Sequence, residues 1–156
     1  MKAASISEIK QALKERTPAQ LVDLNLRLAR YKKENKELLT YLLFEAEDVE
    51  GYIQNCKEEI TTAFSEINTS NFFFIRKSLR KILRTTNKHI RFTGSKVVEA
   101  ELLLFFCKKL KESHIAVNKS TALTKLYETL LKKIHAVIKT MHEDLQYDYA
   151  AQLNNL

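Results

Sequence analysis

Apolar residues recur along this chain at intervals of three and four, the spacing that places side chains on one face of an α-helix. The pattern runs through six segments, approximately residues 5–16, 18–33, 36–67, 72–92, 96–112 and 121–144. Glycine and proline, which the turns of strand-rich folds require, number only two and one in 156 residues. We therefore expect an all-α fold in which short polar loops join the helices.

Polar residues mark several of the expected helix ends. Thr17 is followed by Pro18 and Gln20, which predicts an N-cap, a proline at the first helical position and a capping box. Gly94 is placed to end the helix over residues 72–92 in the left-handed conformation. Ser95 is then the N-cap of the next helix.

The most regular apolar pattern is a heptad repeat over residues 36–67. Its seam consists of Leu39, Leu42, Ala46, Val49, Ile53, Cys56, Ile60, Ala63 and Ile67. An unbroken helix over this range would be about 48 Å long at 1.5 Å per residue. We expect either an elongated bundle or a bend near Gly51. Residues 102–107 are apolar on every side of their helix, so we expect that helix at the centre of the fold.

The length of the chain fits one domain. We expect a single helical domain over residues 1–156, built as an antiparallel bundle of five to six helices, with residues 146–156 as a polar C-terminal tail. A short α-solenoid of helical hairpins is the alternative architecture.

The location of the protein is inferred from its cysteines and its apolar runs. Cys56 and Cys107 are far apart and lack the spacing of a disulfide framework, which favours a reducing compartment. No signal peptide is recognised, and the longest strongly apolar run is too short to cross a bilayer. We expect a cytoplasmic protein without a transmembrane segment.

Charge is distributed unevenly along the sequence. Residues 72–96 hold eight of the 26 basic residues and none of the 19 acidic ones, so the rest of the chain has 18 basic and 19 acidic residues. Helical spacing aligns six of the eight on one side of the helix. These six form what we call the basic face: Lys77, Arg80, Lys81, Arg84, Lys88 and Arg91.

The basic face has several possible roles. A run of like charges is often only a solvated helix surface. However, these charges repel one another, and an ordinary surface would interleave glutamates among them, so we expect an anionic partner. We favour an acidic protein, and non-specific binding to the DNA or RNA backbone is the alternative. Self-association through the acidic cluster, which we define as Glu45, Glu47, Asp48 and Glu50, and contact of 72–74 with an anionic membrane surface remain open.

The nucleic-acid alternative has limits in the sequence. The helix after the basic one is apolar all round, so it does not suit a helix-turn-helix reader of the DNA groove. No aromatic residue is expected between the charges of the basic face, which argues against a platform for stacking single-stranded bases.

Residues that commonly carry catalysis are sparse. Two isolated glycines exclude a phosphate-binding loop, and His135 and His142 are too far apart to share one metal ion. His89 is expected to be solvated. The surroundings of Cys107 are apolar, which does not suit a nucleophile. We expect no cofactor, no metal and no catalytic residue, although an active site assembled from distant segments stays possible. The function favoured by the sequence is that of a non-enzymatic interaction or scaffold protein.

Overall fold

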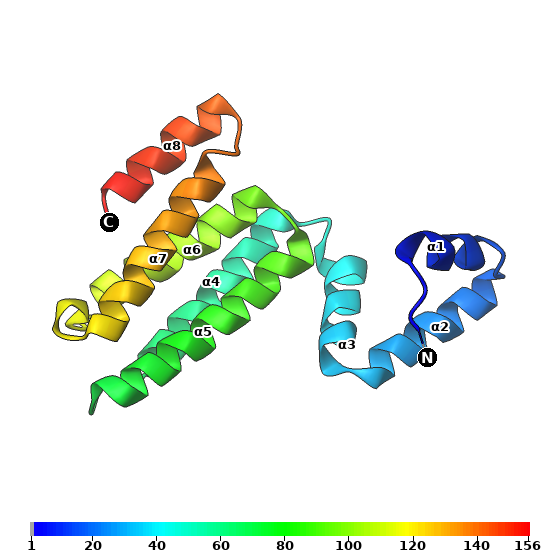
Figure 1. The fold of residues 1–156 in the computed structure, drawn as a ribbon, viewed down its shortest axis with the longest axis horizontal. Coiled ribbons are helices and arrows are strands. Elements are labelled where there is room, and N and C mark those ends of the chain that lie inside the picture. Colours follow the sequence, from blue (N-terminus) through cyan, green and yellow to red (C-terminus); the bar gives the residue numbers. More distant parts are fainter. Residues whose placement is uncertain (1) are drawn as a thin grey trace. The chain divides into compact units, whose positions relative to one another are not determined.

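The structure is a computed structural model that describes residues 2–156, and its regular structure is entirely helical, without a strand in that range (Figure 1). This confirms the all-α prediction. The contacts divide the chain into two compact units, with the boundary between Phe44 and Glu45. The expectation of one domain over residues 1–156 stays a prediction.

The first unit contains helices α1 (Ile6–Lys14), α2 (Pro18–Tyr31) and α3 (Lys33–Thr40). The start signal at Thr17 is confirmed: its hydroxyl accepts from the Gln20 amide, and the Gln20 side chain accepts from the Thr17 amide. Ser5 and Glu8 form a second capping box at the start of α1.

The apolar faces of these helices are exposed. None of α1, α2 and α3 contains a buried residue. Ile6, Leu28 and Tyr31 are 82%, 58% and 78% exposed. An amphipathic pattern identifies the apolar face of a helix but not the element that packs against it, and these short helices do not form a core among themselves.

The long heptad helix is interrupted. A turn of π-helix covers Tyr41–Glu45, and α4 (Val49–Ser65) begins after a break at residues 46–48. The carboxylate of Asp48 caps the new helix by accepting from the Gly51 amide at 2.9 Å. After the break, Cys56 and Ile60 are buried as expected, whereas Tyr52 is buried in place of Ile53.

The second unit is organised around one central helix, as the sequence predicted (Figure 1). Its helices after α4 are α5 (Phe72–Thr93), α6 (Lys96–Glu112), α7 (Thr121–Ile138) and α8 (Glu143–Asn154), with a 3-10 turn at Val117–Lys119. Helix α6 contacts α4, α5, α7 and α8. Leu102, Leu103, Phe106 and Cys107 are completely buried in it. Gly94 has the left-handed conformation expected at the end of α5, with φ +62°.

The C-terminal segment differs from the prediction. The helix expected over residues 121–144 ends at Ile138, and most of the expected tail is helix α8. Tyr149 of α8 is buried and donates its hydroxyl hydrogen to Oε1 of Glu101 at 2.9 Å. No glycine or proline marks the turn between α7 and α8, which explains why the sequence pattern did not reveal it.

Candidate binding face on helix α5

The amphipathic character of α5 is visible in its burial. Five of the six residues of the basic face are exposed, and Lys88 is half-buried. The opposite side of the helix buries Ile75, Leu79, Ile82, Thr86 and Ile90 in the core of the second unit. Because the apolar side of α5 packs into the core, its cations face away from the core.

Most of the basic face has no acidic partner. Within residues 2–156, no ion pair involves Lys77, Arg80, Lys81, Arg84 or Arg91. Several cations elsewhere in the second unit are paired; Lys57, for example, lies 2.7 Å from a carboxylate oxygen of Glu101. These five cations of α5 therefore have no carboxylate partner among the described residues.

The acidic cluster does not neutralise this charge in the described part of the chain. None of its four residues takes part in an ion pair there. Asp48 serves as the N-cap of α4, which is a structural role that the sequence analysis did not assign. The remaining members, Glu45, Glu47 and Glu50, lie at the solvent-accessible start of the second unit.

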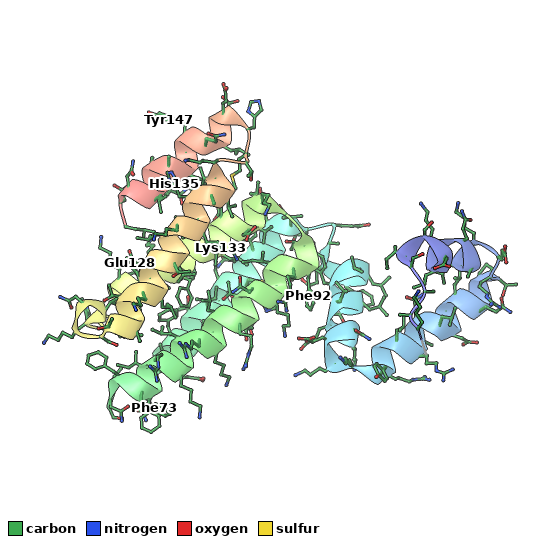
Figure 2. The ribbon with its side chains drawn as sticks, in the orientation of Figure 1. Phe73, Phe92, Glu128, Lys133, His135 and Tyr147 are labelled. Atoms are coloured by element: carbon green, nitrogen blue, oxygen red, sulfur yellow. The ribbon has the colours of Figure 1, made fainter. Side chains whose placement is uncertain are left out.

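An aromatic residue adjoins the N-terminal end of the basic face, although, as expected, none lies between its charges. Phe73 lines a shallow depression of about 350 Å³ together with Arg76, Lys77, Arg80, Lys81 and Arg84. It is 59% exposed and lies at the start of α5 (Figure 2). Because Phe73 precedes Lys77 by four residues, helical spacing alone could have placed it there.

A lysine from α7 extends the positive surface (Figure 2). Lys133 lines a second concavity, of about 500 Å³, with Arg80, Arg84 and Arg91 of α5. Its Nζ lies 3.1 Å from Oε1 of Glu99 and 3.0 Å from Oδ1 of Asn87. The position of Lys133 beside α5 was not predictable from local sequence, because Lys133 is 46 residues from Asn87 along the chain.

Glu99 is the buried anion that holds this lysine in place. Its carboxylate lies 2.9 Å from Nζ of Lys96 and 3.1 Å from Nζ of Lys133. Burial alone would raise the pKa of this carboxyl, but the hydrogen bonds and charges of Lys96 and Lys133 outweigh burial, and the pKa lies below its usual value. Glu99 therefore stays ionised and compensates part of the charge near the basic face.

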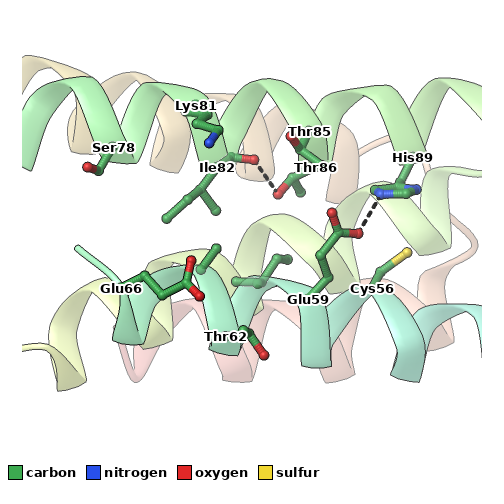
Figure 3. Close-up of a pocket in the computed structure, with 12 residues that line it drawn as sticks. Cys56, Glu59, Thr62, Glu66, Ser78, Lys81, Ile82, Thr85, Thr86 and His89 are labelled. Carbon is green, nitrogen blue, oxygen red and sulfur yellow. Dashed lines mark hydrogen bonds and ion pairs between the residues drawn. The ribbon is translucent and has the colours of Figure 1, made fainter. Parts of the chain in front are cut away.

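A groove runs between α4 and α5, and Lys81 of the basic face lies at its edge (Figure 3). Its floor consists of Cys56, Ile60, Ile82 and Thr86, which are all buried. Its volume is about 500 Å³. We call it the α4–α5 groove, and its remaining lining residues are Glu59, Thr62, Ala63, Glu66, Ser78, Lys81, Thr85 and His89.

His89 is not the solvated histidine expected from the sequence. Its Nε2 lies 2.9 Å from Oε2 of Glu59, and its Nδ1 lies 2.8 Å from the hydroxyl oxygen of Tyr52. The side chain of His89 is only 18% exposed. It faces α4 because its position on α5 lies beside the core, not on the basic face.

The thiols of the second unit do not have the setting of nucleophiles. Burial raises the pKa of Cys107 to about 12, and burial is also the main reason that the pKa of Cys56 is raised to about 11. Among residues 2–156, no group of three or more His, Cys, Asp or Glu side chains is arranged to hold a metal ion. In the same range, no helix combines the length and the apolar character needed to cross a membrane.

No family model, no curated protein sequence and no solved structure matches the chain.

Proposed function

We propose that this protein is a non-enzymatic interaction or scaffold protein that binds an acidic protein partner through the basic face of α5. The observation that carries the proposal is that five neighbouring cations on one helix form no ion pair with any residue in the range 2–156. Unpaired cations on one surface attract and orient a partner of opposite charge.

The chemistry at the start of α5 supports a protein partner. Phe72, Phe73 and Phe74 are 40%, 59% and 39% exposed. Aromatic and arginine side chains are enriched at protein interfaces. There the aromatic ring fills an apolar pocket, and the guanidinium makes two parallel hydrogen bonds to a carboxylate. Phe73 adjoins Arg76 and Arg80 in one depression, so both kinds of contact are available together.

The proposal includes a helical bundle as the architecture that supports the basic face. Helix α6 contacts four other helices of the second unit, which supports a bundle with a shared core. In an α-solenoid, each repeat contacts mainly its neighbours in sequence. A cytoplasmic location is part of the proposal as well, and two buried free thiols, Cys56 and Cys107, suit a reducing compartment.

Non-specific nucleic-acid binding is the second candidate. The basic face spans 15 residues from Lys77 to Arg91, or about 21 Å along the helix, which is enough to contact several phosphates. Lys133 adds a cation from a neighbouring helix, and Phe73 offers a ring on which a base could stack.

A charge-reversal experiment tests the proposal. The α5 variant carries Arg80→Glu, Lys81→Glu and Arg84→Glu. The control variant carries Lys108→Glu, Lys125→Glu and Lys132→Glu, so its net charge changes by the same amount at exposed positions on other helices. Proteins captured from a lysate and identified by mass spectrometry should be acidic, and they should be retained by the control but lost by the α5 variant. Retention of every partner by the α5 variant would exclude the basic face as the binding site.

The same variants separate the two candidates. Random duplex DNA and random RNA are titrated against each protein at about 50 and 200 mM salt. If binding depends on phosphate contacts, raising the salt concentration from about 50 to about 200 mM should lower the affinity on the order of 100-fold. The α5 charge-reversal variant should then lose the binding. No binding at the lower salt concentration would leave the acidic protein as the partner class.

A further inference from the structure

We infer that the α4–α5 groove binds an amphipathic helix of the partner, with the acidic side of that helix against α5. This inference rests on the proposed function, because it assigns a shape and a docking site to the acidic partner. It goes beyond it by adding an apolar contact that the basic face alone does not provide.

The dimensions of the groove suit a helix. Along α4 its lining runs from Cys56 to Glu66, and along α5 from Ser78 to His89. These distances are about 15 and 16 Å at 1.5 Å per residue, or about three helical turns. An open trough of this length between two antiparallel helices matches a third helix better than a compact small molecule.

Small side chains make the groove accessible to a helix backbone. Ala63 of α4 and Ser78 and Thr85 of α5 are half-buried and line its sides. At these positions larger residues would close the space between the two helices. Neighbouring helix axes approach to about 8–10 Å where the side chains at the contact permit it. The floor of Ile60 and Ile82 is apolar, so it favours large aliphatic anchors on the incoming helix.

The charges on the two rims differ in sign. Lys81 lies on the α5 side of the groove, whereas Glu59 and Glu66 lie on the α4 side (Figure 3). Lys81 also lines the depression on the basic face, so the two surfaces are continuous. An incoming helix should therefore carry carboxylates toward α5 and cations toward α4, with its apolar stripe between them.

A second copy of this chain fits the groove less well. Two helices of the first unit, α1 and α2, expose apolar faces that could supply such a helix. Residues 2–44 contain nine basic and five acidic residues, so these helices would bring further positive charge to α5. The charge of the basic face thus favours a different protein as the source of the helix.

Designed peptides provide the test. The probe is an 18-residue stapled helix with a stripe of leucines, glutamates on one flank and lysines on the other. The comparison peptide has the same charges but alanines in place of the leucines. Fluorescence anisotropy with the full chain should give at least tenfold tighter binding for the leucine peptide. Replacing the flanking glutamates of the leucine peptide by lysines should reduce its affinity at least tenfold.

Protein variants locate the binding site. Ala63→Leu with Ser78→Leu fills the groove and leaves every α5 cation in place, and it should remove the preference for leucine over alanine. A photoreactive residue within the leucine stripe provides a second measurement that does not depend on the stability of this variant. Its cross-links should map to α4 and α5 at the groove.

The outcomes distinguish this inference from the proposed function. Equal binding of the leucine and alanine peptides, with loss of both on α5 charge reversal, would overturn the groove and leave the basic face as a binding site. Tight binding of the leucine peptide that is insensitive to α5 charge reversal would overturn the assignment of the acidic flank. Cross-links outside α4 and α5, or no binding of any peptide, would overturn the inference as well.

Discussion

The hydroxyl oxygen of Tyr52 lies 2.8 Å from Nδ1 of His89 and joins α4 to α5 beside the groove. The other ring nitrogen of His89 lies 2.9 Å from the carboxylate of Glu59. When Nε2 carries the hydrogen donated to Glu59, the neutral ring accepts at Nδ1 from the Tyr52 hydroxyl. The two contacts fix the spacing of the helices at one end of the groove.

Removal of the Tyr52 hydroxyl tests this connection. The variant Tyr52→Phe keeps the ring but leaves Nδ1 of His89 without its partner, so we expect a loss of about 1 kcal/mol in the free energy of unfolding. Urea denaturation measures it. The matched control is Tyr147→Phe, because Tyr147 is 80% exposed and forms no buried hydrogen bond (Figure 2). Equal stability of Tyr52→Phe and the wild type would contradict the assigned hydrogen bond.

Glu99 should make the stability of the protein depend on acidic pH. Its pKa is lowered in the folded state, so the ionised carboxylate stabilises the fold above its usual pKa of 4.5, and this contribution is lost as pH falls below that value. We expect Glu99→Gln to cost about 1–3 kcal/mol at pH 7 and much less near pH 3. Urea unfolding at both pH values measures the difference. Glu128→Gln on the exposed side of α7 is the control, and a pH-independent cost for Glu99→Gln would refute the prediction.

The two thiols should react only when the protein unfolds. The pKa values of Cys56 and Cys107 are raised to about 11 and about 12, and both side chains are buried. Since the thiolate is the reactive form, we expect reaction with a disulfide reagent at pH 8 to be at least 100-fold slower than in denaturant. Measurement on Cys56→Ala and Cys107→Ala assigns each rate to one thiol. Rapid labelling of either thiol in the native protein would indicate an opening that the structure lacks.

The end of α5 depends on the conformation of Gly94. Its φ of +62° lies in the region that side chains disfavour, while an added Cβ would have no atom within 4 Å. The variant Gly94→Ala should therefore lose about 1–2 kcal/mol through backbone strain alone. Gly94→Asn, which tolerates this conformation better, should lose less. Thermal and urea unfolding give both values, and an unchanged stability for Gly94→Ala would mean that the helix end rearranges.

The two compact units predict that residues 45–156 fold alone. Among the described residues, every buried residue except Tyr41 lies in this range. A fragment beginning at Glu45 should show a cooperative thermal transition within a few degrees of that of the full chain. Calorimetry of both proteins compares the transitions. Loss of cooperativity in the fragment would instead support the single domain over residues 1–156.

The sequence alone determined the features that depend on neighbours along the chain. The N-cap at Thr17, the end of α5 at Gly94 and the start of α6 at Ser95 follow from local backbone chemistry. The basic face follows from helical spacing, and so does the position of Phe73, although the sequence analysis overlooked it. The central position of α6 was predictable because residues 102–107 leave no polar side for solvent.

Only the tertiary structure decided which residues meet across the chain. Tyr52 and His89 are 37 residues apart, and Tyr149 and Glu101 are 48 apart, so no periodic pattern pairs them. After the break at residues 46–48, packing buries Tyr52, whereas the heptad repeat predicted burial of Ile53. The α4–α5 groove has the same origin, since it exists only because small residues of two separate helices face each other.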